Sequence, residues 1–94
     1  MSQFYYVYVL KSEKDHQLYT GLTIDLKTRF EEHNNGEVSQ TQNRRPMTLI
    51  YYEACLNQQD AAKRERYLKT TWGKRYIKSR LEGYLREPSN NSKN

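Results

Sequence analysis

Four types of side chain that can bind or react with a phosphate group occur in this chain at positions that suggest a common site. Tyr19 lies in a short tyrosine–glycine segment, and Arg29 and His33 follow it by 10 and 14 residues. Glu65 comes much later, in a pattern that otherwise turns apolar residues towards a core. Burying a carboxylate without a partner is costly, so this position calls for a chemical explanation. A phenol, a guanidinium, an imidazole and a carboxylate are together the components of a small phosphate-handling site.

Each of these groups also has an ordinary structural alternative. The forked guanidinium of Arg29 suits a phosphate, but it could equally form a surface ion pair with Glu32 or Asp25. His33 is either a functional imidazole or a hydrogen-bonded histidine near a helix end. Glu65 is the one candidate metal ligand on an inward-facing stripe, or it forms a salt bridge with Arg29 and binds no metal.

Two strand-like segments must position the tyrosines. Residues 4–10 are aromatic and β-branched throughout, which predicts a central strand covered on both faces. Residues 18–23 are predicted to form its hairpin partner, with Tyr19 and Gly21 on one face. A glycine within a strand often marks the close approach of a ligand or another backbone. Taken singly, Tyr8 and Tyr19 fit ordinary sheet packing as well as they fit a site.

The predicted helices carry the other candidate groups. Asp25 or Thr23 can cap a first helix whose inward stripe ends at His33, and residues 34–36, Asn-Asn-Gly, are a stop signal. A second helix is predicted over residues 61–72. Its inward stripe consists of Ala61, Glu65, Leu68 and Trp72. Gly73 is predicted to break this helix, and a short basic helix is expected from about residue 74 to residue 84.

The remaining segments complete an α+β pattern. Polar residues 37–46 are a candidate substrate-facing loop, and residues 47–52 are predicted to form a third strand. The order β-β-α-β-α-α predicts a three-stranded antiparallel sheet covered by helices. One domain over residues 1–84 accounts for this order, and residues 85–94 are predicted to be a disordered tail.

Composition narrows the function further. One cysteine and two histidines provide neither an internal disulfide nor a zinc site, and there is no glycine-rich phosphate loop. With no long apolar segment, the chain is predicted to be cytoplasmic. Residues 1–60 hold six Lys and Arg against eight Asp and Glu, a net charge of −2, whereas residues 61–94 hold ten against three, a net charge of +7. This basic half indicates a polyanionic partner. The candidate nucleic-acid contacts are Arg44, Arg45, Lys63, Arg66, Lys69, Lys74 and Arg75.

These positions together resemble the GIY-YIG nuclease domain. Residues 6–8, Tyr-Val-Tyr, stand where that family has its first tripeptide, and residues 19–21, Tyr-Thr-Gly, where it has its second. Arg29, His33 and Glu65 stand where the family has its catalytic arginine, a histidine or tyrosine, and a metal-binding glutamate. The chain is most similar to small stand-alone bacterial members and to the catalytic half of the structure-specific endonuclease that cuts branched DNA. It departs in two places, because Tyr6 replaces the opening glycine and Leu22 stands where excision-repair relatives have a lysine.

The resemblance implies phosphodiester hydrolysis with Mg²⁺ or Mn²⁺ bound at Glu65. By the same resemblance Tyr19 is the general base, and Tyr8 orients either Tyr19 or the water. Arg29 would clamp the phosphate, and His33 would accept the proton or bind the phosphate.

Three functions follow as hypotheses. The first is a divalent-metal-dependent DNA endonuclease, structure-specific and active in repair or recombination, with a protein partner that supplies targeting. The alternative is a nucleic-acid-binding module that keeps the fold with little or no activity. The third is an adaptor whose tyrosines and basic helix dock another repair protein.

Overall fold

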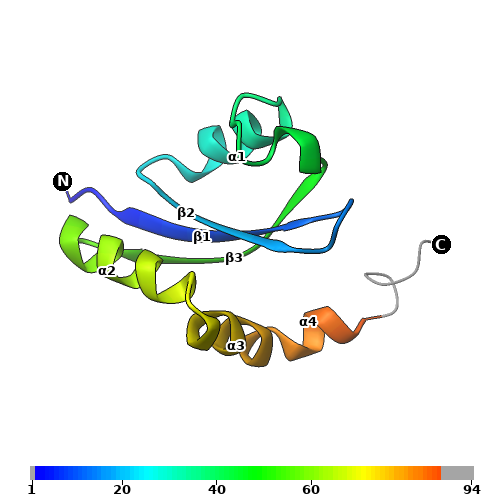
Figure 1. Ribbon diagram of the computed structural model, residues 1–94. Coiled ribbons are helices and arrows are strands. Elements are labelled where there is room, and N and C mark those ends of the chain that lie inside the picture. The colour runs from blue at the N-terminus through cyan, green and yellow to red at the C-terminus, as the bar shows by residue number, and fades with distance from the viewer. Residues whose placement is uncertain (1, 88–94) are drawn as a thin grey trace.

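A three-stranded antiparallel sheet lies between two helical layers in the computed structural model of the chain, which describes residues 2–87 (Figure 1). The strands are β1 (Tyr5–Ser12), β2 (Leu18–Thr23) and β3 (Met47–Cys55), in the order β2-β1-β3. From Val7 onward every residue of β1 is buried, because β1 is paired on both sides and covered on both faces. The predicted α+β class and the central position of the first strand are therefore confirmed.

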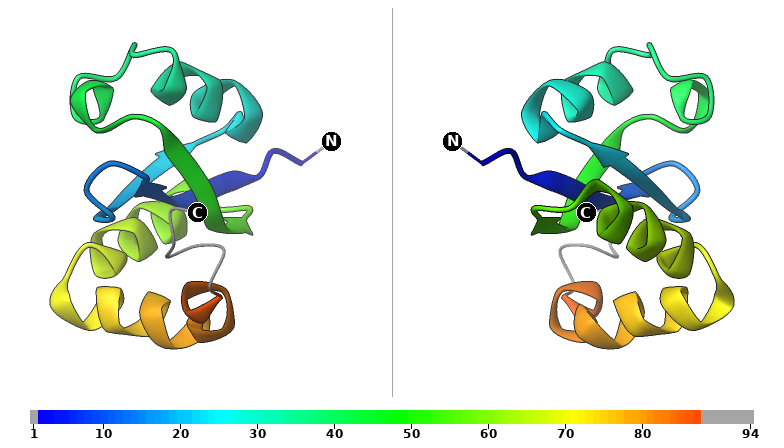
Figure 2. Two further views of the ribbon diagram at one scale, coloured as in Figure 1. Left: turned by 90° about the vertical axis from the view of Figure 1, so that its right-hand side faces the viewer. Right: turned by 90° about the vertical axis from the view of Figure 1, so that its left-hand side faces the viewer.

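The helices are divided unequally between the two faces of the sheet (Figure 2). α1 (Leu26–Asn34) covers one face together with a short 3₁₀ helix, η1 (Gln42–Arg44). The other face carries α2 (Gln58–Leu68), α3 (Thr71–Arg80) and α4 (Glu82–Arg86). Within residues 2–87, no helix has both the length and the apolar composition needed to cross a bilayer.

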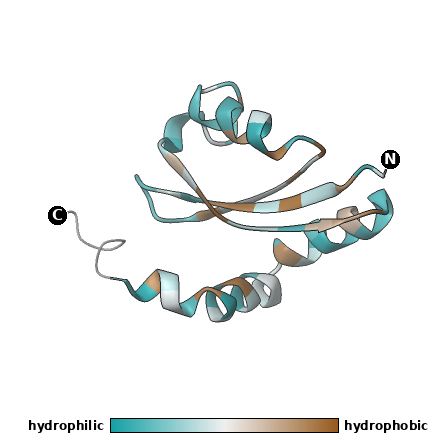
Figure 3. Ribbon diagram, turned by 180° about the vertical axis from the view of Figure 1, so that it is seen from behind, coloured by the Kyte–Doolittle hydropathy of each residue, from teal (hydrophilic) through white to brown (hydrophobic). Residues whose placement is uncertain are grey.

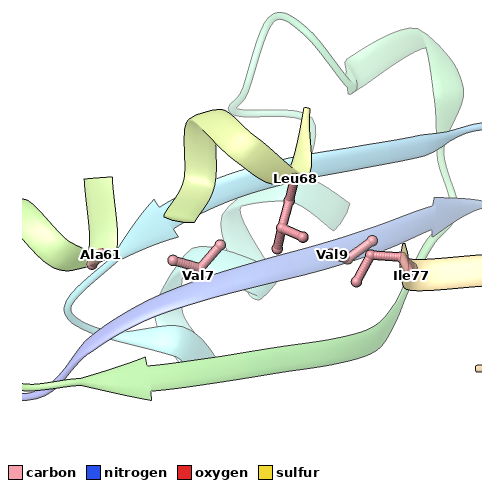
Figure 4. Packing of buried hydrophobic residues seen from close by; sticks show 5 residues of the cluster. All are labelled: Val7, Val9, Ala61, Leu68 and Ile77. Atoms are coloured by element: carbon pink, nitrogen blue, oxygen red, sulfur yellow. The ribbon is translucent and has the colours of Figure 1, made fainter. Parts of the chain in front are cut away.

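The alternation of side chains along β1 builds two separate cores. Val7 and Val9 point towards Ala61, Leu68 and Ile77 of α2 and α3 (Figure 4). Brown apolar segments are concentrated along the strands and recur on parts of the helices, whereas α1 is largely teal and white (Figure 3). A helix with so few apolar residues needs another source of attachment to the sheet, and hydrogen bonds between polar side chains supply it.

The second core combines those hydrogen bonds with aromatic packing. Tyr8, Leu10 and Met47 form its buried centre, with Phe30 of α1 packed against it. His33 is also fully buried, and it is the one fully buried residue of α1. The predicted inward stripe of this helix is therefore confirmed, and its most buried member is a titratable group.

The caps of α1 and α2 follow the sequence signals. The Asp25 carboxylate accepts a hydrogen bond from the backbone N–H of Thr28 at 3.1 Å, and Asn57 accepts one from Asp60 at 3.0 Å. Gly36 follows α1 with φ of +81°, a left-handed conformation that glycine adopts without strain.

The predicted helix over residues 61–72 is wrong at its C-terminal end. α2 ends at Leu68, and the Thr70 hydroxyl caps α3 by accepting a hydrogen bond from the N–H of Gly73 at 3.1 Å. The chain changes direction there, so Trp72 leaves the stripe and is 67% exposed. Gly73 lies inside α3 and does not break a helix. A Cβ at this position would lie 2.1 Å from the carbonyl oxygen of Tyr67, so the glycine permits close packing of α3 against the end of α2.

Three further boundaries differ from the sequence predictions. The polar segment 37–46 is anchored, because Val38 and Thr41 are buried and η1 lies within it. β3 continues to Cys55, three residues beyond its predicted end. α4 extends to Arg86 and so includes the first residues of the predicted tail, while residues 88–94 lie outside the described part of the chain.

Candidate active site

A buried chain of hydrogen bonds links β1, α1 and the segment before η1. The Tyr8 hydroxyl lies 2.9 Å from Nε2 of His33, and Nδ1 of His33 lies 2.7 Å from Oγ1 of Thr41. Thr41 in turn donates a long hydrogen bond of 3.5 Å to the Val38 carbonyl, which can only accept. In the His33 tautomer that agrees with this bond, Thr41 accepts from Nδ1–H of His33 and Nε2 accepts from the Tyr8 hydroxyl.

Gly21 makes room for the Tyr8 ring. The two residues are directly paired across β1 and β2, and a Cβ on Gly21 would lie 2.4 Å from the Tyr8 hydroxyl oxygen. A close approach does occur at this glycine, but the group that approaches is the Tyr8 side chain, not the ligand or backbone expected from the sequence. Any larger residue at position 21 would push the phenol away from His33.

Burial keeps both members of the buried pair neutral. It raises the pKa of Tyr8, with Arg29 acting in the opposite direction. Burial, reinforced by the nearby Arg29 cation, lowers the pKa of His33 from its ordinary 6.5 to about 4. At neutral pH His33 is therefore an uncharged acceptor for Tyr8 and a poor acceptor for a further proton. This arrangement favours a positioning role for Tyr8 over a role as general base.

Tyr19 is the phenol that a substrate can reach. Its ring centroid lies 5.0 Å from that of His33 and 6.4 Å from that of Tyr8. Tyr19 is only partly buried and lines a shallow hollow of about 190 Å³ together with Lys69 and Lys74. A phenol beside two cations, at an opening to solvent, is placed to meet a phosphate.

Arg29 stands at the edge of the same group. Its guanidinium forms an ion pair of 2.9 Å with Glu32, the alternative foreseen from the sequence. It also interacts with Tyr8, and these two partners raise the pKa of Arg29. Because its side chain remains 37% exposed, the guanidinium can reach a bound anion while Tyr8 and Glu32 hold its direction. The ion pair and the phosphate-clamp role are therefore compatible.

Glu65 approaches from α2, on the other side of the β2 edge. Its side chain is 21% exposed and forms an ion pair of 3.0 Å with Lys69. The alternative pairing with Arg29 is wrong, since Arg29 pairs with Glu32. Glu65 is close enough to interact electrostatically with Tyr8, and Lys69 connects it to the hollow at Tyr19.

The donor set suits a hydrated hard cation better than a fully coordinated one. Among residues 2–87 there is no group of three His, Cys, Asp or Glu side chains that could hold a metal ion. Mg²⁺ commonly keeps several waters and uses one or two carboxylates with phosphate oxygens. The partly buried oxygens of Glu65 fit that mode once Lys69 moves aside or turns to the phosphate.

The predicted nucleic-acid contacts fall in different places. Lys69 and Lys74 line the hollow at Tyr19. Arg44 forms an ion pair of 2.9 Å with Asp15 at the β1–β2 hairpin, and Arg75 lies over the Trp72 ring at 5.0 Å. The remaining three are exposed, away from that hollow: Arg45, Lys63 and Arg66.

Sequence reasoning overlooked two parts of the site region. Thr41 gives no signal, because a threonine in a polar segment is normally solvated, and its partner His33 lies eight residues earlier. Lys11 directly follows the strand predicted over residues 4–10, and in the structure it belongs to β1 and is 5% exposed. Lys78, four residues after Lys74, was detectable as its neighbour on one helix face.

The sheet, its two tyrosines and the arginine–histidine helix define a known class of domain. Residues 4–87 match the GIY-YIG catalytic domain, and the chain therefore belongs to the GIY-YIG family, a nuclease superfamily. Its relatives are UPF0213 proteins. It is 46% identical over 65 residues to one from Clostridium perfringens, covering 68% of this chain and 69% of that protein. It is 39% identical over 80 residues to one from Staphylococcus saprophyticus, covering 84% and 96%. The solution NMR structure of the UPF0213 protein BH0048 from Bacillus halodurans matches with a TM-score of 0.51 and 29% identity, covering 96% of this chain and 94% of that chain.

The buried histidine should make the fold acid-sensitive. The unfolded chain binds a proton on His33 near its ordinary pKa of 6.5, whereas the folded chain does so only near about 4. The stability that this difference contributes is complete above 6.5 and is lost as the pH falls towards 4. We expect the free energy of unfolding to fall by about 2 kcal/mol between pH 7 and pH 5. Urea titrations across this range measure it.

The matched variants use the two histidines of the chain. His33→Gln should flatten the dependence, because glutamine has no titrating group there. His16→Gln, at an exposed position, should keep it. An equal slope in His33→Gln and wild type would show that another group titrates.

Proposed function

We propose that the chain is a divalent-metal-dependent endonuclease that hydrolyses phosphodiester bonds in DNA. The observation that supports the proposal is that the Tyr8 phenol interacts electrostatically with Tyr19, Arg29 and Glu65, which come from β2, α1 and α2. Tyr19 also lines an open hollow with Lys69 and Lys74. Branched or damaged DNA in cytoplasmic repair or recombination is the substrate setting that fits a small basic domain of this family.

In this proposal the exposed side chains act on the substrate, and the buried side chains hold them in position. Tyr19, at the opening, acts in its phenolate form and accepts a proton from the attacking water to become the phenol, and Arg29 binds the phosphoryl oxygens as their charge develops. Tyr8 donates its hydrogen bond to His33, so its oxygen can accept from Arg29 and hold that guanidinium in place. His33 and Thr41 thereby act as positioning residues, because they fix Tyr8 and do not reach the hollow.

Glu65 is the residue that would hold the divalent ion. Such an ion supplies polarisation of the phosphate and charge stabilisation at the leaving oxygen. Lys69 now neutralises Glu65, and its release from that pair would turn a second cation towards the phosphate. Lys74 faces the same hollow from α3 and adds to the positive field.

A nucleic-acid-binding module with little catalysis is the second candidate. The observation that favours it is the Glu65–Lys69 ion pair, in which an ammonium group already satisfies the proposed metal ligand. In that case the basic surface would bind the backbone in a salt-dependent manner, and metal ions would change nothing. The two candidates differ in whether strand cleavage follows metal addition.

The test is nicking of a labelled flap or junction substrate with and without Mg²⁺ or Mn²⁺. We expect metal-dependent cleavage that chelation stops. Glu65→Gln should weaken apparent metal affinity by at least the roughly 10–100-fold that loss of an outer-shell partner costs, with partial recovery at high metal concentration. Glu53→Gln, a partly buried carboxylate held by Arg64, is the matched control for its effect on folding. Binding without any cleavage, or Glu65→Gln that cuts like wild type, would favour the binding module.

A further inference from the structure

A basic pocket lies between the β1–β2 hairpin and the helices α3 and α4. Its volume is about 140 Å³, roughly that of five water molecules at about 30 Å³ each, which is enough for one phosphate group. Its lining includes Lys11, His16, Gln17, Leu18, Lys74 and Lys78, and no lining residue is acidic. Three of these residues carry full positive charges, and they come from β1 and α3, far apart in the sequence.

The three lysines of this pocket are not members of the ion pairs described within residues 2–87, whereas the neighbouring Lys69 is paired with Glu65. Lys11 is only 5% exposed, and its ammonium group lies 5.6 Å from the centre of the Tyr84 ring. The carboxylates of Glu13 and Glu87 act on the Tyr84 phenol but do not line the pocket. Three ammonium groups that line one small pocket repel one another, and a bound anion would offset that repulsion.

The basic pocket is continuous with the hollow at Tyr19. Leu18 and Lys74 line both, so the two openings share a wall along the β2 edge. A linear polyanion lying in the hollow would pass directly into the basic pocket. A free small anion needs no such continuity, but a nucleic-acid strand with regularly spaced phosphates does.

The hairpin wall of the basic pocket is held rigidly. The Ser12 hydroxyl accepts hydrogen bonds at 3.0 Å from the backbone N–H groups of Lys14 and Asp15, and it donates one at 2.6 Å to the Arg44 carbonyl. The Arg44 side chain forms an ion pair with Asp15 and lowers the pKa of that carboxyl to about 2, so the pair persists at neutral pH. A preformed wall reduces the ordering cost of binding.

We propose that the basic pocket binds the backbone phosphate next to the scissile one, through Lys11, Lys74 and Lys78. This subsite belongs to the same strand-binding path as the proposed nuclease function and rests on it. The subsite recognises the charge and the spacing of the backbone phosphates and makes no contact with the bases. It therefore sets where a strand lies relative to Tyr19, without sequence preference.

Binding without cleavage tests this subsite. The protein carries Glu65→Gln and the buffer contains a chelator, so that a fluorescent single-stranded oligonucleotide is bound but not cut, and anisotropy is followed as salt is raised. Lys78→Gln should lower the slope of log K against log salt by about 0.7, the value for one lost phosphate contact on a single strand. Lys14→Gln removes the same charge, from the β1–β2 hairpin, but Lys14 lines a different hollow, and its replacement should leave the slope unchanged. Lys78 is exposed on α3, so its replacement should not unfold the protein.

A series of oligonucleotides with one neutral methylphosphonate each locates the contact. At one linkage the neutral group should weaken binding by wild type more than binding by Lys78→Gln, because part of the interaction it removes is already lost in the variant. Equal slope losses in Lys78→Gln and Lys14→Gln, or additive effects at every linkage, would overturn the subsite. Those results would leave metal-dependent cleavage by wild type untouched, so failure here is distinguishable from failure of the proposed nuclease.

Discussion

Replacing Tyr19 by phenylalanine is expected to lower kcat for DNA nicking by about 10²–10⁴-fold, the usual range for losing a general acid–base group. Within the described residues the Tyr19 hydroxyl makes no hydrogen bond to protein, so its removal should leave stability and oligonucleotide binding nearly unchanged. The ring contacts with Tyr8 and His33 are kept by phenylalanine. Single-turnover nicking rates with saturating enzyme measure the effect on the chemical step.

Two other tyrosines serve as comparisons. Tyr52→Phe changes an exposed tyrosine on β3 and should nick like wild type. Tyr8→Phe removes the donor to His33 at 2.9 Å, so it should lower the unfolding midpoint as well as the rate. If Tyr19→Phe retains wild-type rates while Tyr8→Phe loses them at unchanged stability, the roles of the two phenols are reversed.

The strands and the first helix were predictable because their signals are local. Alternation in residues 18–23 placed Tyr19 and Gly21 on one face, and β2 has those bounds and that face. Asp25 as a cap and Gly36 after the stop are short-range hydrogen-bonding and backbone preferences that the fold respects. Both tripeptides of the family motif, together with Arg29 and His33, lie in this region, and of the residues that carry the resemblance only Glu65 lies outside it.

The break between α2 and α3 was not predictable in the same way. Helical periodicity continues through Leu68 to Trp72, and Gly73 appeared to be the stop. The actual stop depends on the Thr70 cap, and Gly73 is required by the approach of α3 to the Tyr67 carbonyl. That approach is a tertiary contact, and a single sequence carries no sign of it. As a result, the predicted inward stripe wrongly included Trp72, while Glu65 was still placed on the inner side of the helix.

The geometry of the site was only partly accessible from the sequence. Spacing identified Tyr8, Tyr19, Arg29 and His33, but nothing in the sequence indicated that Thr41 would hydrogen-bond to His33. That contact depends on the tertiary fold. The ion pair of Glu65 with Lys69, by contrast, joins i,i+4 neighbours and could have been predicted from their spacing. Residue types and spacing therefore predicted which groups carry the chemistry. Only the fold shows which residues hold those groups in place.

Arg29→Gln is expected to lower kcat by about 10²–10³-fold, equivalent to about 2.7–4 kcal/mol of barrier, if Arg29 stabilises charge on the phosphoryl oxygens. The side chain is 37% exposed and its ion pair with Glu32 is also partly exposed, so stability should change little. Single-turnover nicking and thermal unfolding of the same samples separate the two effects.

Two variants distinguish the forked guanidinium from positive charge alone. Arg29→Lys keeps the charge but loses the planar pair of donors, so it should recover only a small part of the lost rate. Glu32→Gln releases Arg29 from its ion pair while leaving the guanidinium intact, and it should reduce the rate far less than Arg29→Gln does. Full recovery by lysine would mean that Arg29 contributes a general positive field. Equal losses in Glu32→Gln and Arg29→Gln would mean that the ion pair, and not contact with the phosphate, is what the site requires.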